Sequence, residues 1–140
     1  MSFLIVVVAL LGGIGCGMES PTAPPPPVTV GLDQDFELAP GQTGILGDSG
    51  LSVVFDRVGN DSRCAVDVTC VWEGDAAVMV TGSRAGQDMG RFELHTSTQM
   101  GTREARYGDF LIRMQNLTPQ PRSTDRIKAE AYRLVLRVTR

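Results

Sequence analysis

The chain has 140 residues, 42% of them hydrophobic, with 13 basic and 16 acidic side chains and a formal net charge of -3. This length suits one domain with a modest core and excludes two sizeable domains. Residues 1–90 carry 3 basic and 11 acidic groups, whereas residues 91–140 carry 10 and 5. Two halves of a small domain usually interleave, so mutual neutralisation is the preferred interpretation of this asymmetry, and a basic binding face is the alternative. The chain lacks a basic run with interleaved aromatic residues, so nucleic acid is not an expected partner.

The N-terminal segment is apolar without interruption over residues 3–11, and no charged residue precedes Glu19. Such a segment is typical of the hydrophobic region of a secretory signal peptide. A membrane-spanning helix needs about 20 apolar residues, and here that length would have to include several glycines, which form helices poorly. We therefore expect residues 1–15 to be a signal peptide rather than a permanent membrane span.

The segment that follows contains the first of three cysteines. Gly13-Ile14-Gly15-Cys16 resembles the lipobox of bacterial lipoproteins, although that family usually has Leu where this chain has Gly13. The resemblance implies that Cys16 becomes the mature N-terminus and is lipidated, which would make the membrane a partner through the lipid. In the same family an Asp after the Cys commonly means retention at the inner membrane. Gly17 therefore favours the outer membrane, in an organism that has one.

Residues 16–30 are predicted to form a tether. Residues 17–27 read GMESPTAPPPP, and prolines with fixed φ and no amide donor favour an extended polyproline conformation. At about 3.1 Å per residue this spacer would reach roughly 35 Å. A PxxP ligand for a signalling partner is the alternative interpretation.

After Val28 the chain consists of short segments in which apolar and polar residues alternate, and these segments are separated by Gly, Pro, Asn and Asp. Helical periodicity is nearly absent. The pattern predicts a single all-β domain over residues 31–140, an antiparallel sandwich or small barrel of about six to eight strands with one disulfide. The clearest predicted strands are residues 36–38, 51–55, 70–82, 91–95, 110–115 and 132–139. The predicted aromatic core consists of Phe55, Trp72, Phe92, Phe110 and Tyr132.

Gly47-Asp48-Ser49-Gly50 matches the letters around the nucleophile of chymotrypsin-like proteases. The rest of that pattern is missing, because Leu51 replaces the next Gly and the one histidine, His95, follows the serine instead of preceding it. A turn rich in Gly, Asp and Ser explains the same letters. A triad of Ser49, His95 and Asp109 remains an enzymatic alternative, since triads are recognised by geometry. By default, His95 is a solvated side chain on the polar face of its strand.

Cys64 and Cys70 form an even pair once Cys16 is lipidated, and in an exported protein such a pair predicts a disulfide. Zinc is disfavoured because there is no second cysteine pair. We expect Asp61 and Arg63 to fix this loop through a charge-assisted hydrogen bond. Period-two spacing places Cys70 and Trp72 on one face, so the indole is expected to pack on the disulfide, unless a bulge at Gly74 changes the register.

The motif around these cysteines, with Asp61-Ser62-Arg63-Cys64 followed by Val68-Thr69-Cys70-Val71-Trp72-Glu73-Gly74, resembles a pattern found in uncharacterised bacterial lipoproteins and secreted proteins. The resemblance covers residues 34–138 and implies no activity. Hard oxygen ligands for Ca²⁺ are a second interpretation of the acidic residues nearby. They are Asp56, Asp61, Asp67, Glu73 and Asp75.

No nucleotide, redox or zinc-protease motif occurs, so we expect no cofactor and prefer a non-catalytic envelope module, which binds an envelope protein or glycan or serves as a structural spacer. A small secreted hydrolase is the alternative. Four arginines at outward strand positions would form a basic face if their strands were neighbours, and ordinary solvation is the simpler interpretation. They are Arg91, Arg113, Arg133 and Arg137.

Overall fold

The computed structural model describes residues 23–140, so the predicted signal peptide and the lipidation of Cys16 lie outside the described residues. Within this part the chain forms nine strands and two short 3-10 helices. Their bounds are β1 Val28–Val30, β2 Asp35–Leu38, β3 Thr43–Leu46, η1 Gly47–Ser49, β4 Leu51–Asp61, β5 Ala76–Arg84, β6 Gln87–His95, β7 Glu104–Tyr107, β8 Phe110–Thr118, η2 Ala129–Ala131 and β9 Arg133–Thr139. None of the helices in residues 23–140 is long and apolar enough to span a bilayer.

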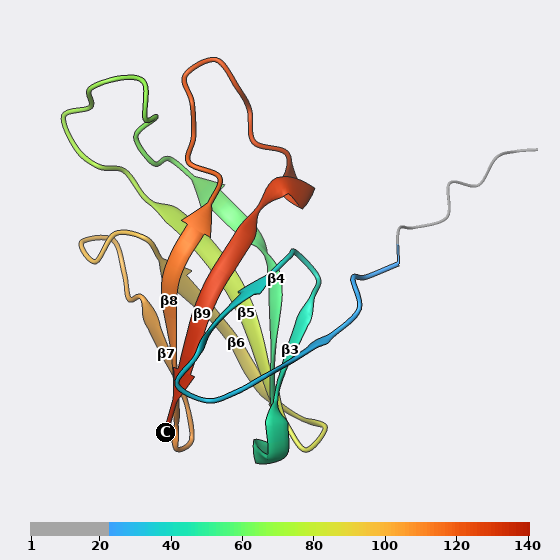
Figure 1. Cartoon of the computed structure of the whole chain (residues 1–140). Coiled ribbons are helices and arrows are strands. Elements are labelled where there is room, and N and C mark those ends of the chain that lie inside the picture. The colour runs from blue at the N-terminus through green and yellow to red at the C-terminus, as the bar shows by residue number, and fades with distance from the viewer. Residues whose placement is uncertain (1–22) are drawn as a thin grey trace, which may run out of the picture.

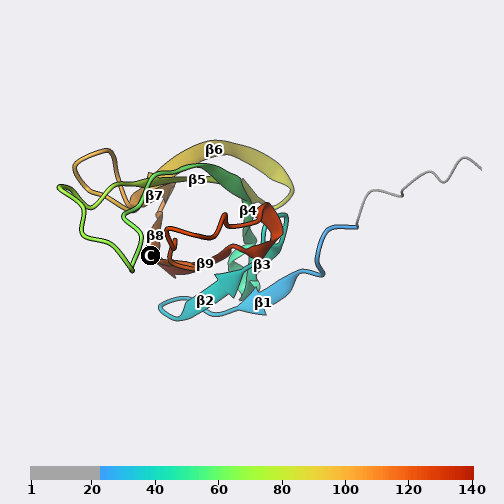
Figure 2. The same cartoon turned by 90° about the horizontal axis from the view of Figure 1, so that it is seen from above.

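The strands form two sheets that face each other (Figures 1 and 2). One sheet has the order β1-β3-β4-β5-β6 and the other the order β2-β9-β8-β7. All pairs of neighbouring strands are antiparallel except β1 and β3. The all-β prediction is therefore confirmed, and the two sheets form a sandwich rather than a closed barrel.

The core lies between the sheets and follows the alternation seen in the sequence. Along β4 the side chains of Leu51, Val53 and Phe55 are fully buried, because every second side chain of a strand points to the same face. The opposing sheet contributes its own alternating set, which is Phe36, Leu38, Ala105, Tyr107, Phe110, Ile112, Met114, Leu134, Leu136 and Val138. Phe92 is partly buried and packs edge-on against Tyr107, with ring centroids 4.4 Å apart.

Trp72 does not belong to this core, contrary to the sequence prediction. Its side chain is 56% exposed, and the strand predicted over residues 70–82 begins only at Ala76. The reason lies at Gly74, which has φ +71°, a left-handed conformation that interrupts an extended strand. A Cβ at this position would lie 1.9 Å from the carbonyl oxygen of Ser62, so the two backbones meet directly there. The chain before Gly74 is thus a loop and exposes its tryptophan.

The short strands β1, β3 and β7 were not predicted, and β1 lies in the segment assigned to the tether. β1 pairs in parallel with β3, with Val28 opposite Gly44 and Val30 opposite Leu46. The polyproline segment before β1 is held as well, because Gln42 Nε2 donates a 2.9 Å hydrogen bond to the carbonyl oxygen of Pro26. The last residues of the predicted tether therefore belong to the sheet.

Replacing Trp72 by Ala should lower the free energy of unfolding by about 1 kcal/mol or less, because its side chain lies at the surface. Phe55→Ala is the matched aromatic control and should cost about 3–5 kcal/mol, since Phe55 is fully buried. Urea unfolding of both variants measures the two changes. A loss of equal size in the two variants would contradict the exposed position of Trp72.

Candidate functional site

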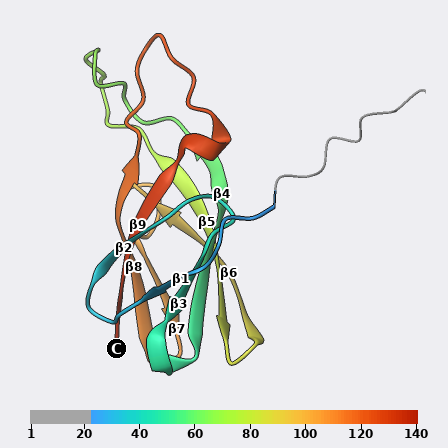
Figure 3. The ribbon, with the colours of Figure 1, turned by 45° about the vertical axis from the view of Figure 1, so that its right-hand side comes forward.

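Three loops project from the same end of the sandwich, and we call them together the loop end. They comprise residues 62–75 between β4 and β5, residues 96–103 between β6 and β7, and residues 119–132 between β8 and β9. Figures 1 and 3 show the first and the third loop extending beyond the strands side by side. The first loop contains the disulfide and is called the disulfide loop below.

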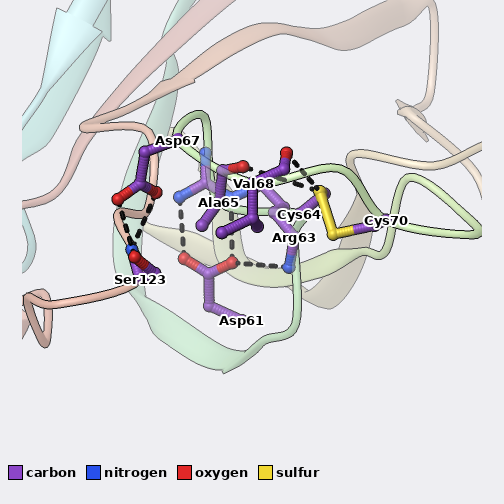
Figure 4. Close-up of a disulfide and its surroundings, with 8 residues drawn as sticks. All are labelled: Asp61, Arg63, Cys64, Ala65, Asp67, Val68, Cys70 and Ser123. Carbon is purple, nitrogen blue, oxygen red and sulfur yellow. Dashed lines mark hydrogen bonds and ion pairs between the residues drawn. A yellow bond between two sulfur atoms is a disulfide. The ribbon is translucent and has the colours of Figure 1, made fainter.

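The Cys64–Cys70 disulfide is present as predicted, with Cα atoms 5.9 Å apart. It closes a ring at the base of the loop, and closing so short a ring stabilises the fold by about 2 kcal/mol in the chain-entropy model. Figure 4 shows Asp61 and Arg63 next to this ring. Arg63 Nε and Nη2 donate to the two carboxylate oxygens of Asp61, at 2.9 and 2.7 Å, which confirms the predicted pair.

Arg63 also joins the two sheets. Its Nη1 donates to the carbonyl oxygen of Leu117, at the end of β8, at 2.7 Å, and its Nη2 donates to that of Pro119, directly after β8, at 2.9 Å. The hydroxyl of Tyr132, the residue directly before β9, donates to Asp61 Oδ2 at 2.9 Å. The Arg63 and Asp61 side chains retain only 7% and 10% of their exposure. This group of hydrogen bonds is called the staple below.

The staple has a consistent charge state. Burial disfavours the carboxylate of Asp61, but the hydrogen bonds and positive charge of Arg63 outweigh burial, so the pKa of Asp61 is lowered. Burial, together with the hydrogen bond to the Asp61 carboxylate, raises the pKa of Tyr132 to about 12, so its hydroxyl remains a donor at neutral pH. Asp61 is therefore ionised and Tyr132 neutral, as the geometry requires.

A second set of contacts holds the disulfide loop to the β8–β9 loop. The backbone amide and hydroxyl of Ser123 donate to the carboxylate of Asp67, at 2.9 and 2.6 Å (Figure 4). The amide of Val66 donates to the carbonyl oxygen of Pro121 at 3.0 Å. Residues 66 and 67 are thereby fixed from outside the disulfide ring as well as from within it.

A network of polar side chains holds the C-terminal end of the disulfide loop, at Glu73 and Asp75. Asp75 is only 5% exposed, and its Oδ1 accepts a hydrogen bond of 2.9 Å from the amide of Ser97. Its Oδ2 lies 2.7 Å from His95 Nδ1. The hydroxyl of Ser97 donates to Glu73 Oε1 at 2.7 Å. Glu73 and Asp75, close to the disulfide, are thus bound to the loop after β6.

His95 is consequently not the solvated side chain that the sequence suggests. Its Nδ1 faces Asp75 and its Nε2 lies 3.0 Å from Glu93 Oε1, so both ring nitrogens can donate only in the protonated imidazolium. The hydrogen bond to Asp75, opposed by burial and assisted by the charges of Asp75 and Glu93, raises the pKa of His95. Gly101 makes room for the ring, because a Cβ there would lie 2.1 Å from His95 Cδ2. The pairing of His95 with Asp75, and that of Asp75 with Ser97, were not predicted from the sequence.

The triad of Ser49, His95 and Asp109 is not assembled. Leu51, at the start of β4, pairs with Arg84 of β5, whereas His95 pairs with Ala77 of the same strand. A strand rises about 3.3 Å per residue, so these two positions on β5 are about 23 Å apart. Ser49 precedes β4 and belongs to the end opposite His95. Its hydroxyl donates to the carbonyl oxygen of Leu46 and accepts from the amide of Leu51, as expected of a turn residue.

Ser97 is closer to His95 but also lacks the arrangement of a nucleophile. Its hydroxyl donates to Glu73 instead of the imidazole, and the residue is only 3% exposed. A depression of about 440 Å³ between β4 and the β8–β9 loop is lined by residues that include no Ser, Cys or His. Neither Ser49 nor Ser97 is therefore arranged as a nucleophile with His95 as its base.

Each of the five carboxylates considered for calcium has a hydrogen-bond partner within the protein, and Glu73 and Asp75 share Ser97. Asp56 accepts from the hydroxyl of Thr81 at 2.7 Å, and the other four are engaged in the contacts described above. In residues 23–140 no three His, Cys, Asp or Glu side chains come together in a way that could hold a metal ion. The geometry of these residues therefore gives the calcium interpretation no support.

The four arginines do not form one basic face. Arg91 is on β6 in one sheet, whereas Arg113, Arg133 and Arg137 are on β8 and β9 in the other. Three of them are paired with carboxylates: Arg91 with Asp56, Arg113 with Glu104, and Arg137 with Asp35. Arg133 donates to the carbonyl oxygens of Glu130 and Tyr132. Local pairing thus accounts for these side chains.

Most of the exposed large apolar side chains of residues 23–140 gather at the loop end. Four lie in the disulfide loop, and Met100 lies in the loop after β6; the exception is Ile45 on β3. The four are Val66, Val68, Val71 and Trp72.

Comparisons of the chain with protein-family models, curated proteins and solved structures find no match. Its function therefore has to be inferred from its own residues and geometry.

Replacing Arg63 by Met should lower the free energy of unfolding by about 3–5 kcal/mol, because it leaves the buried Asp61 carboxylate without its counterion. Arg113→Met is the matched control. Its partner Glu104 is exposed, so this loss should stay below about 1 kcal/mol. Urea unfolding at pH 7 compares the two variants, and similar losses would argue against the staple.

The pair of His95 and Asp75 should make stability depend on pH. Because folding raises the pKa of His95, its stabilisation is complete below the unfolded value of about 6.5 and is lost as the pH rises through the higher folded value. The free energy of unfolding of the wild type should thus fall relative to that of His95→Gln between pH 6 and 9. Urea unfolding across this range measures the difference, and parallel profiles would refute it.

Proposed function

We propose that this chain is a lipid-anchored protein of the bacterial cell envelope, and that its β domain is a non-catalytic module that binds an envelope component through the loop end. The apolar segment of residues 3–11 and the lipobox-like residues up to Cys16 support export and lipidation. The Cys64–Cys70 disulfide agrees with an oxidising compartment outside the cytosol. Gly17 after the cysteine favours the outer membrane.

The observation that carries the binding proposal is the exposure of Val71 and Trp72 on a loop that is held in place. Val71 is fully exposed and Trp72 is 56% exposed. Apolar side chains on a free loop would tend to collapse onto the domain, but the staple, the disulfide and the contacts of Asp67 fix this loop away from it. Tryptophan is enriched among residues that dominate binding energy, and clustered exposed apolar residues mark interaction sites.

A non-catalytic role is supported by the state of the candidate nucleophiles. The hydroxyl of Ser49 serves a turn and that of Ser97 serves the Asp75 network. Loops at the end of a rigid β-sandwich are, by contrast, well suited to binding, because the scaffold holds them in position. Since the arginines on the sheets are paired locally, the loop end is preferred over the predicted basic face as the contact surface.

Mass spectrometry of the full chain expressed in a bacterium tests the anchor. The mature protein should begin at Cys16, carry acyl chains there and contain the bond between Cys64 and Cys70. Cys16→Ser should abolish acylation and leave a precursor with residues 1–15 uncleaved. A mature protein that begins elsewhere, or an unmodified Cys16, would refute the lipid anchor.

Site-specific photocrosslinking in cells tests the contact surface. A photoreactive amino acid at Val71 should trap an envelope component, whereas the same group at Ile45, an exposed apolar position outside the loop end, should not. Equal yields at both positions, or none at Val71, would contradict binding through the loop end.

A further inference from the structure

The disulfide loop presents its apolar residues as a projecting tip. Val66, Val68, Val71 and Trp72 are each about half exposed or more, and they lie within one short stretch of chain around the disulfide. The depression beside β4 and a second one of about 410 Å³ near Ser49 are lined by other residues. Figure 1 shows this loop extending away from the sheets. The four side chains are thus exposed on a projecting loop and line neither depression, an arrangement that suits insertion into a soft apolar phase.

The composition of the tip favours the interfacial layer of a lipid bilayer as this apolar phase. Residues 64–72 read CAVDVTCVW and contain one charged residue, Asp67, whose carboxylate is bound by Ser123. Without Lys or Arg, the tip has no means of attracting anionic lipid or polymer. Val can enter the acyl boundary of a bilayer, and Trp favours the interface between headgroups and hydrocarbon. Burying one Val side chain changes a partition constant about tenfold.

The length of the segment between Cys16 and Ala23 limits how far the tip can lie from the bilayer. Cys16 lies seven residues before Ala23, the first described residue. At about 3.1 Å per residue these span roughly 22 Å when extended. A lipid on Cys16 therefore holds the domain beside the bilayer surface. The tip, at an end of the sandwich, then meets that surface at a high effective concentration.

We propose that the tip formed by Val66, Val68, Val71 and Trp72 inserts into the interfacial layer of the lipid bilayer to which the chain is anchored. This inference rests on the proposed function for its anchor and specifies the envelope component as the lipid surface itself. The lipid on Cys16 and the tip then form two separate attachments to one membrane. The domain is held with its loop end against the bilayer instead of rotating freely on its tether.

The experiment uses the chain from Gly17 onward, which carries no lipid and contains every strand and core residue of the domain. Trp72 is its only tryptophan, so fluorescence reports directly on the tip. Phosphatidylcholine vesicles should shift its emission to shorter wavelength, and lipids brominated near the headgroup should quench it. Val71→Asp should lower the partition constant at least tenfold, whereas the matched control Ile45→Asp should leave it unchanged.

Three outcomes would overturn the insertion. They are no spectral shift with vesicles, an unquenched Trp72, or an equal effect of the two Asp variants, in each case with circular dichroism showing an intact sheet. These outcomes leave the lipid anchor unaffected, because acylation of Cys16 is measured separately. If, in addition, a crosslinker at Val71 traps a protein in cells, the binding module stands with a protein as its partner.

Discussion

The ion pair between Arg63 and Asp61 is the contact on which the rest of the loop end depends. Asp61 is the last residue of β4, whereas the carbonyl groups that receive Arg63 lie at and directly after the end of β8, a strand of the other sheet. Apolar contacts between two sheets have little directionality, so they constrain the relative orientation of the sheets less than hydrogen bonds do. A buried guanidinium bound to one carboxylate and two carbonyl groups fixes this end geometrically.

The ion pair between Arg63 and Asp61 fixes the position of the disulfide loop. Arg63 is adjacent to Cys64, so the base of the ring starts from a fixed point, and Glu73 and Asp75 close the loop on the other side through Ser97. The loop is thus held at both of its ends and, through Asp67, in its middle. Most of its polar side chains are turned toward the protein to make these bonds. Its apolar side chains are left to face outward, the reverse of the usual arrangement.

The parts of the fold that sequence reasoning could predict are those set by period-two alternation, such as Leu51, Val53 and Phe55. Alternation failed at Trp72, because the pattern continues in the letters although the left-handed Gly74 ends the strand. It also missed β7, which is four residues long. The pair of Asp61 and Arg63 is local and was predicted, whereas His95 and Asp75 are twenty residues apart and only the pairing of β5 with β6 brings them together.

The parallel pairing of β1 with β3 has a mechanical consequence for the proposed lipid-anchored state. Tension arriving along the polyproline segment first meets the hydrogen bond between Gln42 and Pro26, and then runs along the axis of β1. Ladder hydrogen bonds lie across the strand direction, so a pull along β1 loads those of residues 28–30 together, in shear, instead of opening them one after another. In the proposed anchored state, a pull along β1 would therefore be resisted by several hydrogen bonds at once.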